Sequence, residues 1–367
     1  MSLLSEKIGR FTQLFASNPL YAFRVLGRVA IRETQAKLAW FGAISGFTAS
    51  IYYLIASAAF RTEHQAVLKG KLAFRSAKIR SLSSSARLRR NTHRLEKGLI
   101  MRPRRPIFAE AYIGETVSDY REACLSKTLD EGERAWAGDV LSMYFSIVGS
   151  SPQIDRARDI FLSASEPSEA PNRIPYPSNS RTRSDVTFEE LERLFLERRS
   201  TRWFEQRPVP RDQIEMAINA ASLAPSACNR QPYSYAVLDN PEHAVAVAKL
   251  AGGTSGFADN IPCLIAAVGS LSCYPEERDR HLIYIDASLA NMQLMLAFQT
   301  LGLSTCPINW PDIAERDKAI GAALDLLPHE RVVMLIAVGF PIEDGHIPYS
   351  QKKPAQLLIR KDERAAS

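Results

Sequence analysis

Cysteine and histidine are scarce in this chain of 367 residues, and neither follows a catalytic or metal-binding pattern. The five cysteines contain no Cys-x-x-Cys pair and are odd in number, which is typical of reduced thiols rather than of a secreted disulfide scaffold. The six histidines show no ligand spacing, so no metal site is predicted. The chain also lacks a Ser-His-Asp set and a P-loop. The sequence therefore offers none of these motifs as the source of a catalytic activity.

Acidic residues are nearly missing from the first 108 residues. That part holds 20 Lys and Arg against 4 Asp and Glu, a net +16, whereas the remainder holds 26 against 36, a net −10. The length and a hydrophobic content of 46% are enough for two or three domains. We therefore predict a basic, helical N-terminal extension at 1–108, followed by an acidic globular part.

One stretch of the extension, Leu38–Phe60, has 23 residues and no charge. Its length would span a bilayer, and Trp40, Tyr52 and Tyr53 could lie at the interface. Gly, Ser and Thr dilute its hydropathy, so a helix buried against the protein or a partner subunit is the other interpretation. The stretch begins too late for a signal peptide and lacks the cleavage pattern.

Lys and Arg run through residues 61–108 without aromatic interleaving, zinc-ligand spacing or a nucleic-acid-binding module. Nucleic acid is therefore not predicted as a partner. A basic stretch beside an apolar helix suits an anionic membrane surface, and a solvated helix face is the alternative. We expect a cytoplasmic protein, either free or held at the inner face of the membrane.

The remainder of the chain shows three further regions. Residues 109–162 have helical apolar spacing, and 163–185 are rich in Ser, Pro, Asn and Arg, which predicts a linker. Residues 186–367 alternate helical and strand patterns, which indicates an α/β or α+β sandwich. Its expected helices are Phe188–Arg198, Arg211–Leu223 and Tyr284–Leu301, and its expected strands are Tyr233–Leu238, Cys263–Val268 and Val332–Pro341. Thr187 and Glu190 predict a capping box for the first helix.

The expected helix Tyr284–Leu301 is apolar on most sides, and Asp286 is its only charged residue. A helix that is hydrophobic all round must be buried, and the simplest partner is a second copy of the same helix. We therefore expect a homodimer, which a charge at Met295 should disrupt.

Two polar segments stand 20 to 30 residues apart in this domain. Arg198-Arg199-Ser200-Thr201-Arg202 follows the first expected helix, and a guanidinium offers a planar fork of donors that matches phosphate oxygens. Ala224-Pro225-Ser226-Ala227-Cys228-Asn229-Arg230-Gln231-Pro232 follows the second helix. Its amides both donate and accept, as the edge of a flavin pyrimidine ring requires.

These two segments resemble the start of the FMN-dependent nitroreductase family. The similarity continues through Leu301–Trp310 and Lys352-Lys353-Pro354, in the order that the family shows. It implies a nitroreductase-like sandwich, a central mixed sheet flanked by helices, for 186–367. The stretch His93–Leu99 also resembles an element of nitroreductase-like proteins that carry such an N-terminal extension.

The resemblance assigns site residues by position. It implies phosphate, ribityl and ring contacts from Arg198, Arg199, Ser200, Arg202, Pro225, Ser226, Asn229, Gln231, Pro307, Ile308, Lys352 and Lys353. The backbone N–H groups of Asn309 and Trp310 would approach flavin N5 and O4 as the catalytic contacts. Many relatives have an acidic residue and a glycine there, so the indole of Trp310 is expected to narrow or replace the substrate pocket.

The resemblance also implies an activity. NADH or NADPH would reduce FMN, and a nitroaromatic, quinone or enone acceptor would then bind over the same face, which gives ping-pong kinetics. One alternative is a specialised flavoenzyme of a membrane or surface-polysaccharide pathway with a dedicated substrate. Another is a non-catalytic flavin-binding scaffold whose pocket Trp310 blocks.

Overall fold

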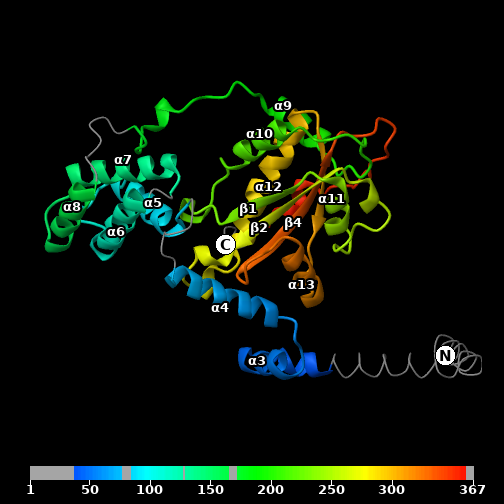
Figure 1. The fold of residues 1–367 in the computed structure, drawn as a ribbon, viewed down its shortest axis with the longest axis horizontal. Helices are drawn as coiled ribbons and strands as arrows, with labels where there is room; N and C mark the ends of the chain where they lie inside the picture. The colour runs from blue at the N-terminus through cyan, green and yellow to red at the C-terminus, as the bar shows by residue number, and fades with distance from the viewer. Residues whose placement is uncertain (1–36, 77–83, 127–128, 165–171, 361–367) are drawn as a thin grey trace, which may run out of the picture. The chain divides into compact units, whose positions relative to one another are not determined.

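The computed structural model describes residues 37–76, 84–126, 129–164 and 172–360 (Figure 1). It divides into two compact units, Met1–His64 and Gln65–Ser367. The predictions for residues 1–36, and for the part of the linker at 165–171, lie outside the described residues.

In the first unit, the uncharged stretch forms two helical pieces instead of one. Residues 37–42 are helical, a turn follows, and α3 (Gly46–Ile55) starts anew at Ser45. Ser45 and Thr48 form a capping box, in which each side chain accepts the backbone N–H of the other. No residue of α3 is buried. Within the described ranges, no helix combines the length and hydropathy needed to cross a membrane.

Four helices of the second unit share one hydrophobic core. They are α5 (Ala86–Leu99), α6 (Glu110–Ser126), α7 (Glu131–Ile147) and α8 (Pro152–Ala164). Leu88 and Leu95 of α5 pack with Ile113, Val140 and Phe161 of the other three. The predicted boundary after residue 108 therefore falls inside this core, because α5 packs with the helices that follow it. The preceding helix, α4 (Arg61–Ser76), crosses the division between the units.

The C-terminal part of the second unit holds the sheet and its covering helices. Its elements are α9 (Phe188–Glu197), α10 (Arg211–Ala221), β1 (Tyr233–Leu238), α11 (Pro241–Ala248), β2 (Cys263–Ser270), α12 (Leu282–Thr300), β3 (Ser304–Asn309), α13 (Ala314–Ala323), β4 (Glu330–Gly339) and α14 (Ala355–Leu358). The capping box between Thr187 and Glu190 opens α9, which confirms that prediction.

The strands pair in the order β1-β2-β4-β3, and all three pairings are antiparallel. The mixed sheet that we expected is thus antiparallel in its four strands. Among the described residues, parallel pairing occurs at one isolated bridge, between Ser200 and Thr305. Helices separate these strands along the chain, and such a pattern favours a prediction of parallel strands. The direction of each strand is set instead by its neighbour in space.

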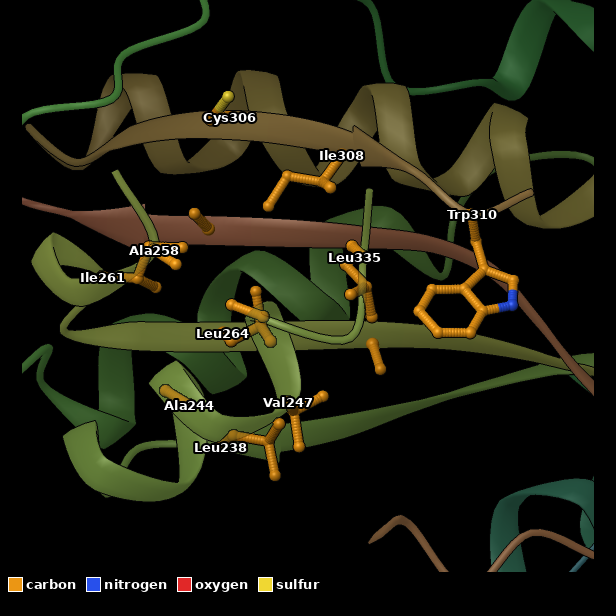
Figure 2. Packing of buried hydrophobic residues seen from close by; sticks show 14 of the residues in the cluster. Leu238, Ala244, Val247, Ala258, Ile261, Leu264, Cys306, Ile308, Trp310 and Leu335 are labelled. Atoms are coloured by element: carbon orange, nitrogen blue, oxygen red, sulfur yellow. The ribbon is translucent and has the colours of Figure 1, made fainter. Parts of the chain in front are cut away.

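Helices cover both faces of this sheet, and alternating residues supply the two cores. Cys263 and Ile265 of β2 pack toward α10 and α12, whereas Leu264 and Ala266 pack toward α11 and α13. Figure 2 shows the second of these cores, with Trp310 among its labelled residues. Because β2 is buried on both faces, its sequence reads as one continuous apolar run.

Candidate functional site

The polar segment after α9 runs along the edge strand of the sheet. Arg198 ends α9, and Thr201 N–H then donates to the carbonyl of Thr305 in β3 at 3.1 Å. Ser200 forms the parallel bridge with the same residue. This short pairing fixes the backbone, so the side chains from Arg198 to Arg202 project from a rigid support.

Four cationic side chains of the predicted set converge on one cavity of about 120 Å³. Its wall consists of Arg198, Arg199, Ser200, Arg202, Pro348, Ser350 and Lys352, none of which is acidic. Arg199 Nη2 donates to the carbonyl of Pro348 at 3.1 Å and also to that of Tyr349, which ties the C-terminal segment to the wall. Lys353, the other lysine of the predicted pair, is exposed and does not line the cavity.

The electrostatics of this cavity favour an anion. Burial lowers the pKa of Arg198, and the neighbouring Arg199 lowers it further. The Nε of Arg198 is buried without a hydrogen-bond partner. A phosphate ester would pair with the surrounding positive charges, which means that the residues present fit the phosphate end of FMN.

The second predicted segment forms a tight loop with unusual backbone geometry. Cys228, Asn229 and Gln231 have φ angles of 53°, 52° and 49°, a region that residues other than glycine seldom occupy. Ser226 Oγ accepts the N–H of Gln231 at 3.1 Å, and the Asp286 carboxylate accepts the N–H of Ala227 at 2.9 Å. These bonds hold the loop against the first turns of α12.

The amide of Gln231 is engaged within the chain at both ends. Its Nε2 donates to the carbonyl of Ser222 at 2.7 Å, and its Oε1 accepts from Arg89 at 2.8 Å. We expected this amide to read the flavin edge; the structure instead uses it to hold the loop. Asn229 is half-buried, and its backbone carbonyl accepts from Arg89.

The two segments lie at opposite ends of α12 within one chain. Asp286, near the start of α12, binds the loop at Ala227, whereas Gln299, near its end, donates to Glu197 beside the arginines at 3.0 Å. Thirteen residues separate Asp286 from Gln299, which corresponds to about 20 Å along a helix. Arg202 and Asn229 of the same chain are therefore not placed to contact the same ring edge.

The third predicted segment is a strand and not a loop. Pro307, Ile308 and Asn309 belong to β3, where Asn309 pairs with Met334 of β4. Ile308 is buried in the core, Pro307 is half-buried and Asn309 is exposed.

The indole of Trp310 lies in the same core as Ile308, and only 7% of the residue is exposed (Figure 2). Its Nε1 donates to the Asp317 carboxylate at 2.9 Å, and Arg331 binds that same carboxylate. The indole that we expected to narrow or replace the substrate pocket is thus held in the core of its own chain. Strand alternation puts residues 308 and 310 on one face, and the indole N–H has its partner inside the protein.

Sequence reasoning missed three residues that shape the site. Asp286 is 3% exposed, accepts the Tyr274 hydroxyl at 3.1 Å as well as the loop N–H, and has a pKa that burial raises. Its signal in the sequence was a lone charge in an apolar helix. Arg89, which reaches the same loop from the helical bundle, and Glu133, which binds Arg89, gave no such signal.

Comparison with known proteins places this domain in a family. The model of the family described as "Nitroreductase family" matches residues 196–255 and 244–340. The chain is similar to an iodotyrosine deiodinase of Nematostella vectensis, with 22% identity over 64% of this chain and 97% of that protein. It is also similar to a putative NADH dehydrogenase/NAD(P)H nitroreductase of Archaeoglobus fulgidus, with 28% identity over 42% of this chain and 88% of that protein.

A solved structure gives a further similarity. It is an FMN-dependent nitroreductase from Clostridium difficile, with 24% identity, a TM-score of 0.37, and coverage of 42% of this chain and 91% of that one. The family match spans the sheet and α12, and it begins two residues before the arginines of the cavity. The domain at residues 196–340 is therefore a nitroreductase-family domain.

Proposed function

We propose that this protein is an FMN-dependent enzyme that passes two electrons from NADH or NADPH to an organic acceptor. The observation that carries the proposal is the cavity beside α9, where Arg198, Arg199, Arg202 and Lys352 converge and no acidic residue lines the wall. Membership in the nitroreductase family supports flavin-dependent oxidoreductase chemistry.

Each part of the cavity has a role in this proposal. Arg198, Arg199, Ser200 and Lys352 hold the phosphate, and Arg202 lies toward the ring. FMN, when bound, supplies two-electron transfer between the nicotinamide and the acceptor. The backbone at Asn309 and Trp310 would offer N–H groups from the end of β3, and fixed donors of this kind need no rearrangement during reaction. One binding face that serves both reactants gives ping-pong kinetics.

A second copy of the chain completes the site in this proposal. Ile285, Leu289 and Met292 form an exposed apolar stripe on α12, at 52%, 45% and 39% exposure, and their spacing puts them on one helix face. Met295, where we expected the dimer contact, is buried in the core of its own chain. Pairing through the exposed stripe would bring Pro225, Ser226 and Asn229 of one copy toward the arginines of the other.

The choice of acceptor belongs to the proposal as well. Nitroaromatics, quinones and enones are the first candidates, and proteins named iodotyrosine deiodinase are among the relatives. A halogenated phenol should therefore be assayed beside a quinone and a nitroaromatic compound. A dedicated substrate of a membrane or surface-polysaccharide pathway would show as slow turnover of all three. A non-catalytic scaffold would turn over none of the three acceptors. That alternative required Trp310 to block the pocket, whereas its indole is buried in the core.

We further propose that the first unit docks the protein on the cytoplasmic face of an anionic membrane. Trp40, Phe47, Leu54 and Ile55 are between 72% and 76% exposed, in a stretch without charge. At ten residues, α3 is about 15 Å long, half of a hydrocarbon core, so it suits an interfacial position. Basic residues on either side of the stretch favour anionic headgroups.

The decisive experiment for the enzymatic proposal is an absorption spectrum of the purified protein. We expect the visible bands of oxidised FMN, their loss on addition of NADH or NADPH without oxygen, and their return when a quinone is added. A colourless protein that takes up no FMN on reconstitution would refute the proposal. A yellow protein that neither nicotinamide reduces would support the scaffold alternative.

A further inference from the structure

The helical bundle reaches directly into the loop that the proposed function places next to the flavin. Arg89, on α5, donates from Nε to the carbonyl of Asn229 at 2.8 Å and from Nη2 to Oε1 of Gln231 at 2.8 Å. Its third nitrogen, Nη1, donates to the carboxylate of Glu133 at 3.0 Å. All three nitrogens of one guanidinium are therefore used, two of them on a loop 140 residues away.

Glu133 fixes the orientation of that guanidinium. Its side chain, on α7, is 3% exposed and accepts the N–H of Ser85 at 2.8 Å and the hydroxyl of Ser84 at 2.7 Å. It thereby ties the start of α5 to α7, and the ring of Trp136 lies 5.5 Å from the Arg89 guanidinium carbon. The side chain of Arg89 is itself only 15% exposed, and Glu133 balances its charge. The bonds of Glu133 to the start of α5 fix the direction in which the guanidinium points.

The loop that Arg89 binds has a conformation that needs such support. Cys228, Asn229 and Gln231 all have left-handed backbone angles. Residues stay in this region only when the surrounding structure holds them there. Asp286 holds the start of the loop at Ala227, Ser226 links the start to Gln231, and Arg89 holds the second half through Asn229 and Gln231.

We propose that Arg89 is a positioning residue for the flavin-proximal loop, so that the N-terminal helices are a working part of the flavin site. The inference rests on the proposed function, because the loop matters for flavin only if the domain binds it. Arg89 does not itself touch the cofactor in this proposal. It sets the backbone of residues 226–231, and Glu133 sets Arg89.

The first test is FMN affinity, measured by fluorescence titration of the full-length protein. Arg89→Ala should weaken FMN binding by about 10- to 100-fold, since two charge-assisted hydrogen bonds to the loop are lost. The FMN affinity of Arg89→Lys should lie between those of the wild type and Arg89→Ala, because a single ammonium cannot span both acceptors. Arg94→Ala is the matched control: Arg94 is on the same helix, with its guanidinium 3.8 Å from the centre of the Tyr112 ring, and it should bind FMN like the wild type.

The second test does not involve flavin. Cys228 is half-buried within the loop, so its alkylation by iodoacetamide, followed by peptide mass spectrometry, reports loop opening. Without FMN, Arg89→Ala should react several-fold faster at Cys228 than the wild type and Arg94→Ala. Glu133→Gln should show a smaller increase. If Arg89→Ala fails to fold, Arg89→Lys carries both measurements.

The outcomes separate the inference from the proposed function. A wild type that binds no flavin would refute the proposed function, and a faster Cys228 reaction in Arg89→Ala would then still show the clamp on the loop. A wild type that binds FMN, together with an Arg89→Ala variant that matches Arg94→Ala in affinity and in alkylation rate, would overturn the inference.

Discussion

At the scale of single residues, the sequence indicated the arginine-rich segment after α9 but not how its side chains combine with others. Arginine-rich helix ends are common, and only the convergence of Arg198 with Lys352, over 150 residues away, makes this one a cavity. Local motifs cannot reveal that Gln231 is bonded at both ends, because its partners Arg89 and Ser222 come from different regions. Side-chain roles of this kind depend on tertiary contacts.

Loss of the Arg198 guanidinium should weaken cofactor binding strongly. Arg198→Ala removes a charge-assisted and partly buried contact, at a cost of about 2–3 kcal/mol, or roughly 30- to 150-fold in Kd for FMN. Arg193→Ala, an exposed arginine on the same helix, is the control and should leave the Kd unchanged. Full FMN occupancy in purified Arg198→Ala would show that the phosphate lies elsewhere.

The two adjacent lysines near the C-terminus should differ in effect. Lys352 lines the cavity and Lys353 does not. We therefore expect Lys352→Ala to raise the Kd for FMN about 10-fold, the loss of one charge-assisted contact, and Lys353→Ala to leave it near the wild-type value. Equal effects from the two variants would contradict the assignment and indicate a general electrostatic contribution.

At the scale of elements, local patterns predicted what local interactions determine. The capping box at Thr187, the strand Tyr233–Leu238 and the buried run that became β2 follow directly from the residues. The strand β3 was missed because Pro307 and polar residues conceal its alternation, and its pairing with β4 is a long-range interaction. Strand direction across the sheet is likewise a property of the assembled fold.

The exposed stripe on α12 leads to a prediction about assembly. Leu289→Glu should give a monomer with at least 10-fold weaker FMN binding, since a buried charge at the proposed interface opposes association and the proposed site needs both copies. Leu125→Glu, at an exposed leucine on α6, should remain dimeric. Light scattering coupled to size-exclusion chromatography measures the molar mass of each variant and so tells monomer from dimer. A monomeric wild type that is loaded with FMN would defeat the dimer proposal.

At the scale of the whole molecule, charge is divided between a basic N-terminal region and an acidic remainder. The sequence predicted this division, and the broken apolar stretch became visible only in the structure, because the capping box at Ser45 starts a new helix within it. An N-terminal region of this composition should respond to the lipid charge of a membrane.

We expect the full-length protein to float with vesicles that contain phosphatidylglycerol, and less with phosphatidylcholine alone. Replacing Phe47 and Leu54 together by Glu should abolish flotation, because both exposed side chains would lose their apolar contact. The same two charges placed at Leu125 and Leu162, exposed on the bundle, are the control. Protein that stays with the soluble fraction at low salt, with either vesicle, would contradict membrane docking.

The separation of the two cofactor segments along α12 has a genetic consequence. If each site takes its arginines from one copy and its loop from the other, Arg198→Ala and Asn229→Ala damage different halves. A mixed dimer of the two variants contains one doubly damaged site and one site with neither substitution. Co-expression of two variants that are each inactive should then restore activity in those mixed dimers, at about one intact site for every two chains. Two alleles of this gene could complement each other, although neither encodes a working homodimer.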